Sequence, residues 1–195
     1  MSTAHFQQAL AARAAAPQTT LHGVFLSILG LGVLLTGPSG VGKSELALDL
    51  ITRGHALVAD DAVEFSRWAA GVVVGTSTPL LAGFMEARGL GILNVERLFG
   101  AVAVRAREQL DLIIRLDAHI QTGFTAEERL HGCRSRQNLL GEEIPTVVLT
   151  RGLGHNLAPL VETACRDHWL RLVGYAADAA FEKRQMAAIT QEQLC

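Results

Sequence analysis

Cysteine and lysine are both scarce in this 195-residue sequence. The three cysteines, Cys133, Cys165 and Cys195, are odd in number and show no C-x-x-C spacing, so neither a disulfide framework nor a zinc site is predicted. This usage favours a reducing compartment, and we expect a cytoplasmic location. Only two of the 17 basic residues are lysines, Lys43 and Lys183, so a lysine that falls inside a motif is informative here.

Strong charge of one sign and long apolar segments are missing as well. The formal net charge is −2 and the pI is near 6.4, which provides no basic surface for nucleic acid or anionic membranes. The most apolar window, residues 21–36, contains His22 and three glycines and is shorter than the roughly 20 residues of a membrane helix. Residues 1–20 hold one arginine and no continuous apolar core of a signal peptide. We expect a protein that binds neither nucleic acid nor membrane.

The length and the 49% apolar content suit one domain with a buried core, and we assign residues 1–20 to an N-terminal arm and residues 21–195 to that domain. Apolar and β-branched runs predict strands at 21–29, 31–36, 56–59, 72–74, 100–105, 111–116 and 144–149. Helical spacing predicts helices at 44–51, after an N-cap at Asn156, and at 176–191. Loops are expected at 75–79, 85–94 and 118–143. The order of these elements predicts an α/β fold, a mixed sheet with flanking helices.

One motif decides the chemistry that we expect. Gly37-Pro-Ser-Gly-Val-Gly-Lys-Ser44 is a G-x-x-x-x-G-K-S phosphate loop between an expected strand and an expected helix. Its glycines let several backbone N–H groups face one phosphate, and the helix N-terminus adds partial positive charge. Lys43 can reach the β- and γ-phosphates of a nucleotide, and Ser44 can bind a Mg²⁺ that bridges them. The predicted nucleotide-binding residues are Gly37, Pro38, Ser39, Gly40, Val41, Gly42, Lys43 and Ser44.

Two adjacent carboxylates, Asp60 and Asp61, follow the expected strand 56–59. In phosphate-loop proteins a second strand ending in an acidic residue orders Mg²⁺. Neighbouring strand residues point to opposite faces, so we expect one carboxylate to face the metal and the other to act as base towards an acceptor hydroxyl. The sequence leaves open which of Asp60 and Asp61 binds the metal and which acts as the base. The N-K-x-D and D-x-x-G signatures of GTPases are both missing, which favours phosphoryl transfer over a GTPase switch.

Segments in order along residues 20–185 together resemble HPr kinase/phosphorylase: Leu21-His-Gly23, the phosphate loop followed by Glu45, Arg53 to Asp61, Glu86-Ala-Arg-Gly-Leu-Gly-Ile92, Gly174-Tyr175 and Phe181-Glu-Lys183. The resemblance implies a P-loop kinase-like mixed sheet of the HPr kinase and PEP carboxykinase type, with ATP and Mg²⁺ as cofactors. It implies that Ser44 and Glu86 bind Mg²⁺ and that Lys43 holds the phosphates. From the pair of adjacent carboxylates we add Asp60 to the expected metal ligands. The resemblance further implies that Asp61 accepts the proton, that His22 assists it, and that Arg129 is a catalytic arginine.

By the same resemblance, the activity is ATP-dependent serine phosphorylation of the phosphocarrier protein HPr, by a homo-oligomer that is a hexamer. Only 20 residues precede the resembling part, where the family has a separate N-terminal domain. In the segment Thr150–Asn156, Gly152 and His155 stand where the family carries two arginines, so we expect weak activity in the reverse, phosphorylase direction. Two alternatives stay open: a small-molecule kinase on the same scaffold, and a nucleotide-binding regulatory module without turnover.

Overall fold

The central element of the fold is one large mixed sheet, seen in a computed structural model that describes residues 17–117, 124–150 and 156–192. The strand order is β1 (Gln18–His22), β5 (Ala62–Ala69), β6 (Val72–Ser77), β9 (Arg107–Asp117), β3 (Leu31–Thr36), β2 (Val24–Ile28) and β4 (Ala56–Ala59). Strand β11 (Glu142–Thr150) also pairs with β9 and carries β10 (Arg134–Leu139). The pairs β3·β9 and β9·β11 are parallel and the others are antiparallel, so the expected mixed α/β sheet is confirmed.

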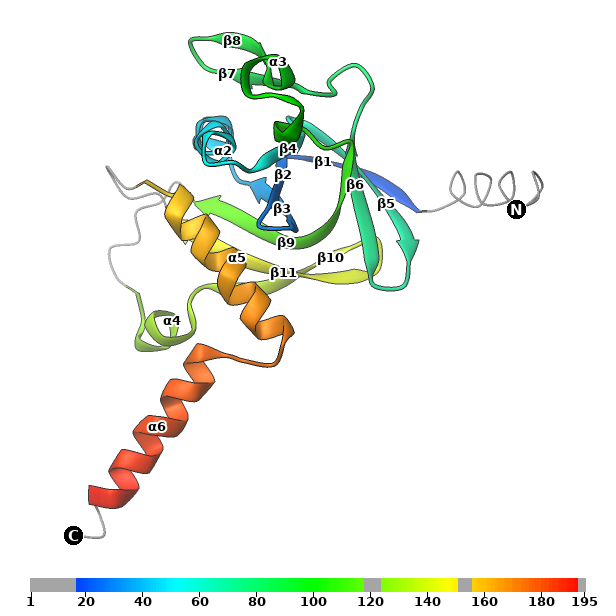
Figure 1. Ribbon diagram of the computed structural model, residues 1–195. Helices are drawn as coiled ribbons and strands as arrows, with labels where there is room; N and C mark the ends of the chain where they lie inside the picture. Colours follow the sequence, from blue (N-terminus) through cyan, green and yellow to red (C-terminus); the bar gives the residue numbers. More distant parts are fainter. Residues whose placement is uncertain (1–16, 118–123, 151–155, 193–195) are drawn as a thin grey trace.

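Helices cover one face of this sheet (Figure 1). The larger core lies between the sheet and two helices, α2 (Lys43–Thr52) and α5 (Ala158–Leu172). A small lobe stands above α2 and consists of the hairpin β7 (Phe84–Ala87) and β8 (Gly91–Asn94), α3 (Val95–Phe99) and the 3-10 turn η1 (Ala101–Ala103). The last helix, α6 (Ala177–Glu192), projects away from the body. None of the described helices is both long and apolar enough to span a membrane.

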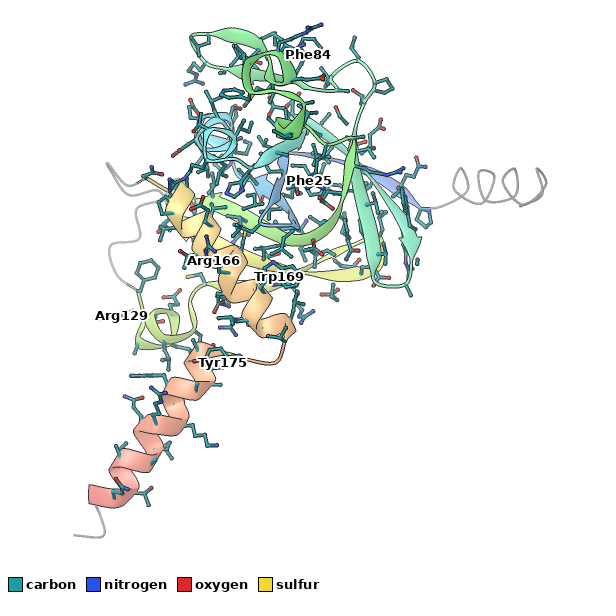
Figure 2. All side chains as sticks on the ribbon, in the orientation of Figure 1. Phe25, Phe84, Arg129, Arg166, Trp169 and Tyr175 are labelled. Atoms are coloured by element: carbon teal, nitrogen blue, oxygen red, sulfur yellow. The ribbon has the colours of Figure 1, made fainter. Side chains whose placement is uncertain are left out.

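A second core fills the opposite face of the sheet. Alternate residues of the central strands divide between the two cores, so that Leu26 and Val33 face the helices while Phe25 and Leu34 face away. Phe25 packs edge-on against Phe65 of β5, with ring centroids 5.4 Å apart (Figure 2 labels Phe25). Burial on both faces explains why β2 and β3 read as continuous apolar runs rather than alternating ones.

Several local expectations were wrong. The expected strand 100–105 contains η1 instead, and the expected loop 85–94 is the hairpin β7–β8. The expected loop 75–79 begins inside β6, which continues to Ser77 by pairing with β5.

Part of the expected loop 118–143 is α4 (Ala126–His131) and β10, while residues 118–123 lie outside the described residues. The N-terminal arm was expected to reach residue 20, but β1 begins at Gln18, because residues 18–22 pair with the edge of β5.

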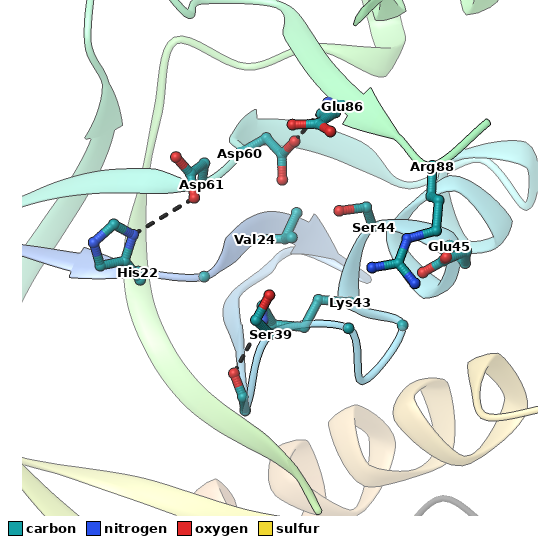
Figure 3. A pocket seen from close by; sticks show the side chains of 14 residues that line it. His22, Val24, Ser39, Lys43, Ser44, Glu45, Asp60, Asp61, Glu86 and Arg88 are labelled. Carbon is teal, nitrogen blue, oxygen red and sulfur yellow. Dashed lines mark hydrogen bonds and ion pairs between the residues drawn. The ribbon is translucent and has the colours of Figure 1, made fainter. Parts of the chain in front are cut away.

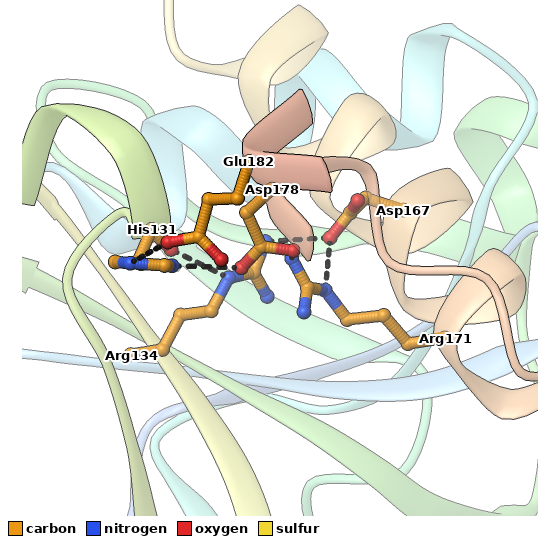
Figure 4. Close-up of polar contacts among 6 residues, drawn as sticks. All are labelled: His131, Arg134, Asp167, Arg171, Asp178 and Glu182. Atoms are coloured by element: carbon orange, nitrogen blue, oxygen red, sulfur yellow. Dashed lines mark hydrogen bonds and ion pairs between the residues drawn. The ribbon is translucent and has the colours of Figure 1, made fainter. Parts of the chain in front are cut away.

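A polar network holds the base of α6 against the body (Figure 4). His131 of α4 contacts Asp178 at 3.1 Å and Glu182 at 3.3 Å. Arg171 of α5 joins Asp178, at 3.0 Å, to Asp167, at 2.9 Å. Hydrogen bonds from His131 and Arg171 lower the pKa of Asp178 to about 2, so this carboxylate is charged at neutral pH. The network fixes where α6 starts, while the rest of the helix is exposed.

The hairpin that leads into the phosphate loop generates the first prediction. A Cβ on Gly32 would lie 1.7 Å from the carbonyl oxygen of Gln109 in β9, whereas a Cβ on Gly30, in the turn with φ +80°, would meet nothing within 4 Å. We expect Gly32→Ala to lower the free energy of unfolding by roughly 3 kcal/mol through the clash with β9. Gly30→Ala, the matched control, should cost only about 1 kcal/mol of backbone strain. Urea unfolding measures both, and equal losses would contradict the close packing of β3 on β9.

Candidate active site

The phosphate loop opens onto a pocket of about 490 Å³ between the sheet and the lobe (Figure 3). The walls come from four parts of the chain: the loop itself, the β1–β2 junction, the end of β4, and β7. Most of the lining residues are polar, and they include His22, Ser39, Lys43, Ser44, Glu45, Asp60, Asp61, Glu86 and Arg88. Of the predicted site residues on the described part of the chain, all but Pro38, Val41 and Arg129 therefore line one pocket.

The phosphate loop has the geometry of an anion cradle. Gly42, directly before α2, has φ +94°, a conformation that a residue with a Cβ rarely adopts. The first N–H groups of α2 therefore open towards the loop, where an anion gains from the helix dipole. Lys43 lies over the loop and its Nζ donates hydrogen bonds to the carbonyl oxygens of Gly37 (3.0 Å) and Pro38 (3.2 Å). A flexible ammonium group and a ring of N–H donors thus surround the space that a phosphate would fill.

Asp60 is the buried carboxylate of the pocket, with a relative exposure of 6%. Its Oδ2 accepts a hydrogen bond from the Glu86 N–H at 2.8 Å, which ties the end of β4 to β7. Burial raises the pKa of Asp60, and the hydrogen bonds from the backbone N–H groups of Glu86 and Asp61 offset part of this shift, while the nearby carboxylates of Asp61 and Glu86 add to it. A buried carboxylate with two acidic neighbours is stabilised as an anion when a cation binds beside it.

Asp61 differs from Asp60 in its exposure and in its backbone conformation. Its side chain is 79% exposed, and its backbone has φ +65°, which is uncommon for a residue other than glycine. The carbonyl oxygen of Asp61 accepts a hydrogen bond from the Gly23 N–H at 3.1 Å, so the strained backbone is held by the β1–β2 junction. Oδ1 of Asp61 lies 3.5 Å from Nδ1 of His22, whose ring is 85% exposed. The two carboxylates thus occupy different parts of one pocket, as expected for adjacent residues at the end of a strand.

The oxygen donors of the pocket suit Mg²⁺. Ser44, Asp60 and Glu86 line the same cavity (Figure 3). Within the described ranges, no group of three or more His, Cys, Asp or Glu side chains is close enough to bind a metal ion by itself. Mg²⁺ is bound in kinase sites by one or two carboxylates together with substrate phosphates, and rarely by a cage of protein ligands alone. A hydroxyl and two carboxylates beside a phosphate cradle are a donor set of this kind.

Known proteins are similar to this chain over most of its length. The sequence model of the HPr Serine kinase C-terminal domain matches residues 13–185. The chain belongs to this family. A protein named HPr kinase/phosphorylase from Bordetella petrii is 51% identical over 177 residues, which are 90% of this chain and 56% of that protein. A protein of the same name from Nitrosomonas europaea is 45% identical over 188 residues, 95% of this chain and 58% of that protein. The chain thus spans little more than half the length of these relatives.

A solved structure in the HPr kinase family has the same fold. The structure titled as the Hpr(Ser) kinase/phosphatase from Coxiella burnetii superposes with a TM-score of 0.75 at 34% sequence identity. The match covers 84% of this chain and 98% of that one. The expected HPr kinase-like mixed sheet with flanking helices is therefore confirmed.

One predicted catalytic residue is not brought to the pocket. Arg129 lies exposed on α4 and is not among the pocket residues (Figure 2). The segment with Gly152 and His155, expected to replace two family arginines, lies outside the described residues.

Arg88, to which the sequence analysis assigned no role, does line the pocket: its Nη2 would lie 3.7 Å from a Cβ placed on Gly40 of the phosphate loop. Arg88 directly follows β7 and lies two residues after Glu86. Because residues 85–94 were expected to form a loop, the sequence offered no strand alternation that would have placed the two side chains on one side.

The burial of Asp60 generates the second prediction. Because burial raises its pKa above the unfolded value of 3.8, the folded state holds the proton more tightly, and stability is lost as the pH rises through the folded pKa. Asn at this position keeps an acceptor for the Glu86 N–H without the charge. We expect metal-free Asp60→Asn to melt about 2–4 °C above the wild type at pH 7, with the difference shrinking towards pH 4. Glu64→Gln, an exposed position on β5, serves as the control. A variant that melts below the wild type at pH 7 would contradict the buried charge.

Proposed function

We propose that this chain is an ATP- and Mg²⁺-dependent serine kinase domain whose substrate is the phosphocarrier protein HPr. The observation that carries the proposal is the convergence, in one open pocket, of the phosphate loop with an exposed carboxylate–histidine pair. Phosphoryl transfer to a hydroxyl needs a phosphate cradle and a base within reach of the acceptor, and both line this pocket. The names of the relatives supply the identity of the acceptor.

In the proposed reaction the phosphate loop binds the triphosphate. The backbone N–H groups of residues 40–44 face its β-phosphate, and Lys43 exchanges the carbonyl oxygens of Gly37 and Pro38 for phosphate oxygens. Arg88 contributes a second cation from the opposite wall. The planar guanidinium binds two oxygens at once, so Arg88 suits the charge that develops on the transferred group and the leaving phosphate.

Ser44, Asp60 and Glu86 would hold Mg²⁺ in this site. A Mg²⁺ held by these residues would supply Lewis-acid neutralisation of the charge that develops on the phosphates during transfer. Asp60 is buried and fixed by hydrogen bonds from the backbone N–H groups of Glu86 and Asp61, whereas Glu86 is exposed and can adjust to the nucleotide. This assigns the buried carboxylate of the pair to the metal and leaves Asp61 for the proton.

Asp61 is the proposed general base. The hydroxyl oxygen of the acceptor serine attacks the γ-phosphorus, the bond from that phosphorus to the β,γ-bridging oxygen breaks, ADP leaves, and the hydroxyl proton passes to Asp61. His22, 3.5 Å from Asp61, orients the carboxylate and stabilises its charge. The exposure of both side chains favours a protein acceptor over a small molecule, because a serine on a protein surface reaches the base only where the base lies near the surface. In the reverse direction we propose low activity, since Gly152 and His155 replace arginines of the family.

The third prediction tests the base. Asp61→Asn should lower the rate of ³²P transfer from γ-labelled ATP to the serine of purified HPr by roughly 10²–10⁴-fold, because the variant cannot accept the proton. Affinity for ATP should stay nearly constant, since Asp61 is not a ligand of the phosphates or of the metal. Lys43→Ala should lose both transfer and ATP affinity, and Glu64→Gln should lose neither. If Asp61→Asn instead abolishes ATP binding at normal Mg²⁺, Asp61 is the metal ligand and the assignment of the two carboxylates is reversed.

We also propose that the chain forms a homo-oligomer, with the hexamer as the expected assembly. Support comes from an unusual concentration of exposed large apolar side chains at the end of α5 and on α6: Trp169, Leu170, Leu172, Val173, Tyr175, Phe181, Met186 and Ile189. Figure 2 labels Trp169 and Tyr175 in this region, next to the projecting helix. Exposed large apolar side chains concentrated on neighbouring elements are typical of subunit contacts.

The fourth prediction concerns this assembly. Light scattering at micromolar concentration should give a mass near six times that of one chain, and Phe181→Glu should reduce it by placing a charge in a buried contact. Gln185→Glu adds the same charge without removing an aromatic ring and is the matched control. A wild-type mass equal to that of a single chain, 20.9 kDa, would exclude the oligomer.

A further inference from the structure

A second, smaller cavity adjoins the phosphate pocket on the other side of the α2 N-terminus. Its volume is about 190 Å³, and it shares Gly42 and Glu45 with the larger pocket. The remaining walls come from α2 and from the N-terminal end of α5, which lies directly below α2 (Figure 1). The two cavities therefore meet at the residues that follow the phosphate loop, and one ligand can extend from the first cavity into the second.

The interior of the second cavity is apolar. Val41, Leu46 and Leu157 line it, and each of them is at least nine-tenths buried, so their positions are fixed by the core. Leu46 packs in the first full turn of α2, and Leu157 immediately precedes α5. A flat apolar group that entered this space would be packed between two helices without rearrangement of the backbone.

The charged groups at the rim exclude a phosphate from this cavity. Glu45 and Asp49 both contribute carboxylates, and the Nε of Arg53 lies 4.0 Å from Oδ1 of Asp49. Among the described residues that line the cavity, none is an arginine, lysine or histidine. An anionic ligand would be repelled, whereas a neutral group with N–H donors would find two acceptors.

Asn156 gives the rim a donor of defined orientation. Its Oδ1 accepts a hydrogen bond from the Ala158 N–H at 2.9 Å at the start of α5. With the oxygen so engaged, the amide Nδ2 is the group that can donate to a ligand. The cavity therefore combines apolar walls with acceptors on the α2 side and a donor on the α5 side, which is the complement of a heterocycle that carries both ring nitrogens and an amino group.

We propose that this cavity binds the purine base of the nucleotide whose phosphates occupy the phosphate loop, an inference that rests on the proposed function. In a nucleoside triphosphate the ribose separates the base from the phosphates, so a base site must adjoin the phosphate site without overlapping it. Gly42 and Glu45 provide that junction. The γ-phosphate then lies at the far end of the larger pocket, on the side of Asp61 and His22, where transfer is proposed to take place.

The fifth prediction is a comparison of two ligands that share the phosphates and differ in the base. Dissociation constants of Mg·ATP and Mg·tripolyphosphate are measured by calorimetry without a protein acceptor. Asp49→Phe and Asn156→Trp fill the cavity from its two helices and should weaken ATP by roughly 10- to 100-fold, the effect of losing one well-packed apolar contact. Tripolyphosphate should bind both variants within about threefold of the wild type, because neither residue lines the phosphate pocket.

Two control variants guard the interpretation. Thr52→Phe and Leu160→Trp place the same ring types on exposed positions of α2 and α5 outside the cavity and should leave both ligands unaffected. Unchanged ATP affinity in both cavity-filling variants would overturn the base site while leaving the proposed function intact. Equal weakening of both ligands would assign the effect to the phosphate loop and overturn the base site too. Failure of the wild type to bind either ligand would overturn the proposed function itself.

Discussion

One hydrogen bond, from the Glu86 N–H to the carboxylate of Asp60, joins the two walls on which the site depends. Asp60 directly follows β4, a strand buried in the sheet, and Glu86 belongs to β7 in the small lobe. The bond holds the lobe against the sheet and at the same time keeps one carboxylate inside the pocket at low exposure. Such a buried charge opposes folding in the absence of a cation, so the Asp60 carboxylate lowers the free energy of unfolding while it fixes this part of the pocket.

Adjacent residues of the same type acquire different properties here because the backbone turns between them. Asp60 directly follows β4 and is buried, whereas Asp61 has a left-handed backbone and an exposed side chain beside His22. Asp tolerates this conformation better than most residues, yet it still carries strain that the Gly23 hydrogen bond must offset. Strain at an exposed carboxylate that contributes nothing to the core is typical of a residue retained for chemistry.

The parts of the site that sequence alone predicted are those encoded over short distances. The strand, loop and helix around Lys43 follow from a contiguous pattern, and Asp60 and Asp61 follow from the end of the next strand. Glu86 reached the prediction through the family resemblance, because a hairpin in a separate lobe has no local signal that points to the phosphate loop. Arg129 also reached the prediction through the resemblance, and the structure places it on α4, outside the pocket. The strand expected at 100–105 is reduced to a single bridge between Val104 and Leu57, because Ala101–Ala103 form the turn η1.

The N-terminus of α2 gives the proposed site its direction. In the proposed site the phosphate loop would contact phosphate through backbone N–H groups at the start of α2, and this contact alone would not decide which way a nucleotide lies. The two sides of the helix end are not alike: Asp61, His22, Glu86 and Arg88 line one cavity, and Val41, Leu46 and Leu157 line the other. A ligand that is anionic and metal-bound at one end and flat and uncharged at the other has one favourable orientation across such a boundary. The polarity of the two cavities would therefore place the terminal phosphate beside the exposed base and fix the direction of transfer before any acceptor binds.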